Sequence, residues 1–329
     1  MTTKIQFGKL EKVVDSDSNF FLESVRMDWE RKCGSRLPGF LSKLAKVGRT
    51  TYKQAVEHAL ADVRFQNIFT QYNKAVVREA TEYVVENMLD DLTLGYIAHT
   101  KSVDEALAEK YNSRYSTSRH DARVAAIATV LAKDLGANLP GRVSAHLSGG
   151  LHDIGKYDTR HDVLYSHGRL TEEQFEEIKR HPIDGEIFAR RHCVYLKQHP
   201  EIKNPDRDFK TWDAVMNAIG QHHWNIVDAT DKERAEFNEQ NPDKYMAKPS
   251  YGSKKGPDDV PSSLARLVAV ADAHEAMLVR DYSKETNEGK AFTPEQAVIE
   301  LYRDAGDGLR PGTHYDKSIV DKLARYVRN

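Results

Sequence analysis

The stretch LHDIGK at residues 151–156 places a histidine and an aspartate side by side at the end of an apolar helical repeat. This repeat runs from Val143 to Ile154 at steps of four, four and three residues, which is typical of one face of a helix. His152 and Asp153 are therefore expected near the protein interior. An unpaired polar group costs roughly 1–3 kcal/mol there, so both side chains need partners.

The same oddity recurs elsewhere along the chain. His120 begins a stripe that continues through Val124 and Leu131, and other stretches of helical period also carry ionisable residues on the face expected to be apolar. These residues are His181, His222, His223 and Asp272. A single buried histidine is usually a core residue bonded to a carbonyl group. A set that clusters beside carboxylates is better explained by a divalent metal site between bundle helices.

The candidate metal ligands are His120, His152, Asp153, His181, His222, His223 and Asp272. Asp153 is the natural bridge, because a carboxylate offers two oxygens with about four lone-pair sites. The set suffices for two six-coordinate ions that keep positions open for water and substrate. Mixed nitrogen and oxygen donors favour transition metals over magnesium or calcium, so iron or manganese is expected first and zinc or cobalt next.

Composition excludes several classes of protein. The chain has 329 residues with a net charge of −2, which argues against a globally basic nucleic-acid binder, and no polynucleotide partner is expected. No apolar run approaches the ~18 residues that a membrane span needs, so no membrane association is expected. The N-terminus lacks a secretory signal, and two cysteines cannot form a disulfide framework. A cytoplasmic location is the expectation.

Nearly all periodic stretches have a helical period, which predicts an all-α fold. Residues 1–110 contain charged, helix-prone segments without a chemical motif, and Pro38 and Gly39 are expected to separate the first helix from the next. Residues 111–329 contain the metal-site candidates. The polar stretch from Trp224 to Pro261 is expected to be a long loop of the kind that often forms a lid or binding element.

The ordered set of His120, HDIGK, the histidine of RHPIDG, the histidine pair and the aspartate of VAVADAHEAM resembles the HD superfamily of metal-dependent phosphohydrolases. It is most similar to the HD-GYP branch, whose known members hydrolyse cyclic dinucleotides, chiefly cyclic di-GMP. The segments LYSHGRLTEEQFEEIKRHPIDG and DDVPSSLARLVAVADAHEAM also resemble that branch. The resemblance covers about residues 111–329 and implies an HD-domain helical bundle, with residues 1–110 as a helical extension or domain in the position that usually holds a regulatory partner.

The chain departs from the family pattern after the histidine pair. The family has Glu and then Asp-Gly-x-Gly-Tyr-Pro, whereas this chain has Trp224, then Asp228 and Ala229, and no Gly-Tyr-Pro. Tyr251 is a candidate remnant of that motif. Whether this chain shares the family's specificity for cyclic di-GMP is therefore left open. Three-metal members carry a Glu one turn before the first histidine; Ser116 stands there, which favours two metals.

The resemblance implies two overlapping ligand sets. One ion is expected to be held by His120, His152, Asp153 and Asp272, and the other by Asp153, His181, His222 and His223. A metal-bound hydroxide would attack phosphorus. Asp153 and Lys156 are the expected catalytic residues, because Lys156 could contact phosphate or protonate the leaving oxygen. The expected substrate-binding residues are Lys156, Arg280, Lys284, Trp224 and Tyr251.

The first functional hypothesis is a metal-dependent phosphodiesterase that hydrolyses a cyclic dinucleotide. The alternatives are a phosphohydrolase for another nucleotide, a non-catalytic nucleotide-binding signalling protein, and a diiron oxygenase of the HD type. The intact ligand set argues against the non-catalytic reading, and Lys156 with its flanking segments argues against the oxygenase. The expected partner is a small anionic nucleotide, and a homodimer is left open.

Overall fold

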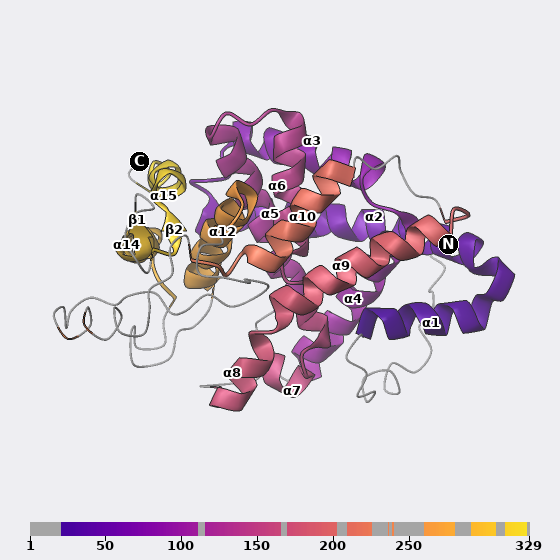
Figure 1. The fold of residues 1–329 in the computed structure, drawn as a ribbon. Coiled ribbons are helices and arrows are strands. Elements are labelled where there is room, and N and C mark those ends of the chain that lie inside the picture. Colours follow the sequence, from indigo (N-terminus) through magenta and orange to yellow (C-terminus); the bar gives the residue numbers. More distant parts are fainter. Residues whose placement is uncertain are drawn as a thin grey trace.

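The structure is a computed structural model, and the prediction of an all-α fold is confirmed (Figure 1). It describes residues 21–110, 116–165, 170–202, 209–225, 260–279, 291–306 and 313–327, together with residues 236 and 239. Within this part of the chain, the only sheet pairs two residues of β1 (Ala305–Gly306) with two of β2 (Tyr315–Asp316) in parallel. No described helix is long and apolar enough to cross a membrane.

The N-terminal helices are α1 (Phe21–Cys33), α2 (Leu37–Ala61), α3 (Gln71–Asn87) and α4 (Asp91–Lys110). The following helices are α5 (Thr117–Asp134), α6 (Leu139–Leu151), α7 (His161–Leu164), α8 (Glu172–Ile178), α9 (His181–Gln198), α10 (Phe209–Gln221), α12 (Ser263–Val279), α14 (Pro294–Asp304) and α15 (Lys317–Ala324). Short 3₁₀ helices are η2 (Gly34–Arg36), η3 (Val63–Phe65) and η4 (Ile154–Asp158).

The break after the first helix lies earlier than expected. Gly34 has a φ of +50°, and the chain turns there through η2. Pro38 and Gly39 belong instead to α2, with the proline in its first turn. A proline is tolerated at that position because the first N–H groups of a helix have no partner within the helix. The expected break at Pro38 is therefore wrong.

Helix α5 is the centre of the molecule. It contacts α2, α3, α6 and α12, and every residue from His120 to Ala132 is buried. One hydrophobic core joins side chains of α2 and α3 with those of α5, α6, α10, α12, α14 and α15. A second core joins α1, α2 and α4 with α9. Both cores thus connect helices on either side of residue 110, where the sequence predicts a domain boundary.

Helix ends bring the candidate ligands together. His152 follows the last residue of α6, His181 begins α9, and His222 lies just after α10. His120 lies in the first turn of α5, where Ser116 caps the helix through the backbone N–H of Arg119. Asp272 is the exception, since it lies within α12. Most of the candidate site therefore forms where several chain segments turn at one place in the bundle.

Candidate metal centre

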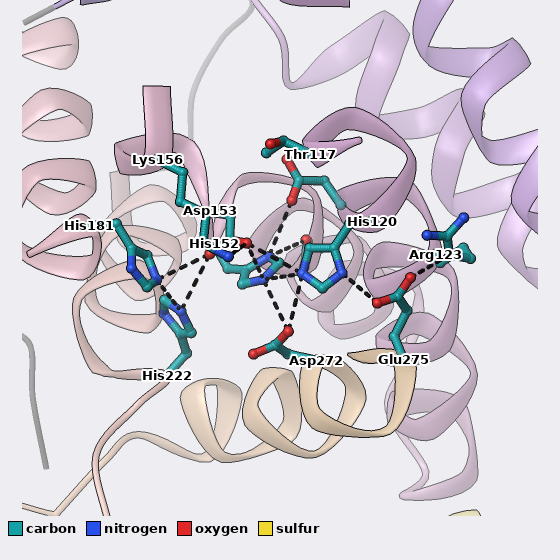
Figure 2. Close-up of polar contacts among 12 residues, drawn as sticks. Thr117, His120, Arg123, His152, Asp153, Lys156, His181, His222, Asp272 and Glu275 are labelled. Atoms are coloured by element: carbon teal, nitrogen blue, oxygen red, sulfur yellow. Dashed lines mark hydrogen bonds and ion pairs between the residues drawn. The ribbon is translucent and has the colours of Figure 1, made fainter. Parts of the chain in front are cut away.

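The first group of candidate ligands surrounds His120. Its Nε2 atom lies 3.3 Å from Asp153 Oδ2 and 3.1 Å from Asp272 Oδ1. The Nε2 atom of His152 lies 3.3 Å from that of His120 and 3.7 Å from Asp272 Oδ1. The structure therefore brings together the four residues expected at one ion, from α5, the end of α6 and α12 (Figure 2).

The second group lies on the other side of Asp153. His181 Nε2 is 3.1 Å from Asp153 Oδ1 and 3.2 Å from His222 Nε2. His223 joins the same group, since ligand atoms of His181, His222 and His223 lie within 4.8 Å of one another. The two oxygens of Asp153 thus face different histidine groups (Figure 2), and its role as a bridge between two ions stays a prediction.

Three of the histidines are oriented in the same way. The Nδ1 atom of His152 donates to the carbonyl oxygen of Gly149 at 2.8 Å. His181 and His222 donate in the same manner to carbonyls three residues earlier, at 2.6 and 2.7 Å. This bond fixes each ring and leaves Nε2 as the atom available to a metal.

The second group also shows why a cation fits. Burial lowers the pKa of His181, and burial with neighbouring imidazoles lowers the pKa of His222 and His223 well below the ordinary value. With Nδ1 as the donor, the Nε2 atoms of His181 and His222 face each other as two lone pairs at 3.2 Å. A divalent cation would convert this repulsion into ligation.

The first group has a different protonation balance. Burial opposes charge on His120, but Glu275 and the nearby aspartates raise its pKa well above the ordinary value. Burial opposes charge on Asp153 and Asp272, but the surrounding histidines, together with Lys156 beside Asp153, hold both pKa values well below the ordinary value. Both pKa shifts favour the ionised carboxylates, which is the form that binds a metal ion.

Sequence reasoning missed Glu275 and Arg123. His120 Nδ1 donates to Glu275 Oε2 at 2.5 Å, and Arg123 Nε donates to Glu275 Oε1 at 2.5 Å. Both residues are buried. A carboxylate behind a ligating histidine fixes the ring and increases its basicity. The available signal was spacing: Glu275 follows Asp272 by three residues, and Arg123 follows His120 by three.

Glu275→Gln is expected to weaken metal binding about 10- to 100-fold. The new amide NH₂ must face either His120 Nδ1 or the guanidinium of Arg123, and both are donors. The measurement is metal affinity by competition with a chromophoric chelator, with Glu295→Gln on the exposed face of α14 as control. Equal affinities for the two variants would contradict a role for Glu275 behind His120.

Asp121 was also missed. It is buried, its Oδ1 atom lies 3.8 Å from His152 Nδ1, and burial raises its pKa to about 7. One ligand atom each of Asp121, His120, His152 and Asp153 lies within the same 4.8 Å cluster. Because Asp121 follows His120 directly, helical periodicity assigns it to another face, and no sequence signal marked it.

Of the predicted catalytic and substrate-binding residues outside the ligand set, the structure describes only two. Lys156 is buried, and its Nζ atom donates to Asp153 Oδ2. Trp224 is 6% exposed, so little of its ring is accessible. Arg280, Lys284 and Tyr251 lie outside the described residues, as does most of the stretch from Trp224 to Pro261. The substrate-binding roles of these residues stay predictions.

Comparisons with known proteins bear on the same region. The family model described as HD domain matches residues 117–277. The chain is 38% identical over 69 residues to 3′3′-cGAMP-specific phosphodiesterase 1 of Vibrio cholerae, covering 21% of this chain and 16% of that protein. It is 30% identical over 99 residues to a cyclic di-GMP phosphodiesterase of Pseudomonas aeruginosa, covering 30% of this chain and 24% of that protein. The matches thus span less than a quarter of either relative.

A solved structure is also similar. It is Bd1817, an HDG"Y"P protein from Bdellovibrio bacteriovorus, with 18% identity, a TM-score of 0.39, and coverage of 84% of this chain and 78% of that one. The family match includes all seven predicted ligands, which lie between residues 120 and 272. Residues 117–277 therefore form an HD domain.

Proposed function

We propose that the protein is an HD-GYP-like, metal-dependent phosphodiesterase that hydrolyses a cyclic dinucleotide. The observation that carries the proposal is the position of Asp153, whose two oxygens face two separate groups of histidine Nε2 atoms. The similarity of short segments to two cyclic-dinucleotide phosphodiesterases supports the substrate class. The proposed substrate is thus a small anionic nucleotide.

The residues divide into two ligand sets that share Asp153. His120, His152 and Asp272 would hold one ion, and His181, His222 and His223 the other, with iron or manganese as the expected metals. When bound, a pair of such ions lowers the pKa of water and neutralises charge on phosphate oxygens. The chain's own part is to fix the imidazoles through Gly149, Ile178 and Ile219 carbonyls and to keep both aspartates ionised.

Lys156 is proposed to act beside the bridging aspartate. It is buried and bonded to Asp153 Oδ2, and with a metal held by Asp153 its ammonium group could turn to a phosphate oxygen. Lysine suits this role because its ammonium is a compact charge on a flexible stem. Its contact would be with substrate charge, whereas the ligand set would act on the attacking water.

The protein purified without chelators is expected to contain about two transition-metal ions per chain, because the ligands form two groups around one shared carboxylate. Elemental analysis measures this content directly. Dialysis against a chelator should remove both the ions and the hydrolytic activity, and added iron or manganese should restore them. A preparation without iron, manganese, cobalt or zinc would contradict the proposed centre.

A second candidate function is hydrolysis of a different nucleotide. The specific observation is that Trp224 replaces the family glutamate after the histidine pair and that the Gly-Tyr-Pro motif is missing. Turnover measured with cyclic di-GMP, 3′3′-cyclic GMP-AMP and mononucleotides separates the two. Hydrolysis of a mononucleotide with no action on either cyclic dinucleotide would favour the second candidate.

A further inference from the structure

A cavity of about 140 Å³ lies between the N-terminal helices and the HD domain. Its walls come from α1, α2 and α4 and from α5, α6, η4, α9 and α10, and most of the lining surface is apolar. Representative lining residues are Leu22, Ile97, Leu151, Ile154, Phe188 and Trp212. The volume is close to that of an engineered apolar cavity of ~150 Å³ that binds benzene, so the space suits a molecule with a single ring.

Two of the buried polar residues that line this cavity have an unpartnered side-chain oxygen. Tyr52 is 8% exposed and Asp121 is 9% exposed, and both belong to the lining. Neither Tyr52 Oη nor Asp121 Oδ1 has a hydrogen-bond partner within the described part of the chain. Leaving such groups unpaired costs roughly 1–3 kcal/mol each. Both groups lie near the end of α6: a Cβ at Gly150 would be 2.7 Å from Tyr52 Oη, and Asp121 Oδ1 is 3.8 Å from Nδ1 of His152.

We propose that the cavity binds a small, mainly apolar molecule that carries one hydroxyl group, of the phenol class. A hydroxyl donates one hydrogen bond and accepts others, so it can donate to Asp121 Oδ1 and accept from Tyr52 Oη at once. The ring would then fill the apolar part of the space. A hydrocarbon in the same place would leave both groups unpaired.

The location connects this cavity with the metal centre. Asp121 follows His120 directly, and its Oδ1 atom lies 3.8 Å from His152 Nδ1. Tyr52 Oη approaches α6 so closely at Gly150 that a Cβ there would lie 2.7 Å from it. An occupant would therefore contact groups next to two proposed ligands. The binding itself is independent of the proposed function, because it requires neither metal nor hydrolysis.

The test compares phenol with toluene as probes of the full-length chain, by saturation-transfer NMR and calorimetric titration. Phenol is expected to bind about tenfold or more tightly than toluene, because toluene leaves both polar groups unpaired. Tyr52→Phe should reduce this ratio by weakening phenol alone. Tyr72→Phe, at a tyrosine of α3 that is 68% exposed, is the matched control and should leave both affinities unchanged.

A second variant tests the location. Ala55 lines the cavity from α2, and Ala55→Phe should fill the space and abolish binding of both probes. Equal affinity for phenol and toluene, or an unchanged ratio in Tyr52→Phe, would overturn the proposal. Wild-type binding of phenol to folded Ala55→Phe protein would also overturn it. If Ala55→Phe does not fold, the ratio in Tyr52→Phe decides the matter alone.

Discussion

Asp153→Ala is expected to abolish hydrolysis and to remove most of the bound metal. Asp153 Oδ2 lies 3.3 Å from His120 Nε2, while Oδ1 lies 3.1 Å from His181 Nε2. Loss of this one carboxylate therefore removes a ligand from both proposed ions. Changing a residue that orients a metal ligand typically lowers metal affinity or activity about 10- to 100-fold. Loss of a ligand shared by two ions should lower them further.

The measurements are metal content by elemental analysis and turnover of the nucleotide that the wild type hydrolyses. Asp213→Ala is the matched control, because the Asp213 side chain on α10 is 62% exposed and pairs only with Arg190 among the ion pairs described. It should retain metal and turnover. Near-normal turnover in Asp153→Ala would contradict a mechanism that depends on two ions sharing this residue.

Gly155→Ala is expected to destabilise the protein and to disturb the second ligand group. A Cβ on Gly155 would lie 2.0 Å from the carbonyl oxygen of His181 and 2.6 Å from the backbone nitrogen of Gly185. These are backbone atoms of α9, so η4 and α9 must move apart. Overpacking of this kind costs about 1–3 kcal/mol or more, and the movement separates His181 from Asp153.

Thermal unfolding and metal content measure the two effects of Gly155→Ala. Gly39→Ala is the control, since Gly39 is an exposed position of α2 where a Cβ meets nothing within 4 Å. Alanine is the better helix former, so this control should equal or exceed the wild type in stability. An unfolding temperature for Gly155→Ala equal to that of the control would show that the backbone contact is not required.

Much of the fold and of the ligand grouping could be predicted from the sequence. Helical periodicity identifies the helices and marks the polar residue on each apolar face, and the family resemblance supplies the pairing of residues that no spacing within one helix can reveal. Periodicity cannot say which faces of different helices meet. For that reason Glu275 behind His120, and Asp121 beside His152, emerge only when α5, α6 and α12 are placed together.

The N-terminal helices show a second limit of prediction from the sequence. Pro38 followed by Gly39 reads as a break, but a proline fits the first turn of a helix, and the turn lies at Gly34 with its positive φ. Likewise, the apolar stripe of α5 predicts one buried face, whereas every residue from His120 to Ala132 is buried. A helix surrounded by neighbours buries its small residues on all sides, which a single stripe does not reveal.

The way the histidine rings are held has a consequence for the order in which the centre forms. His152, His181 and His222 donate to carbonyls only three residues away, so their orientation is encoded locally and can arise as soon as each turn forms. His120 depends on Glu275, which is 155 residues later in the chain. During synthesis, its ring can therefore be oriented only after α12 has been made and has docked on α5. Of these four histidines, His120 is thus the first in the chain and the last to be oriented.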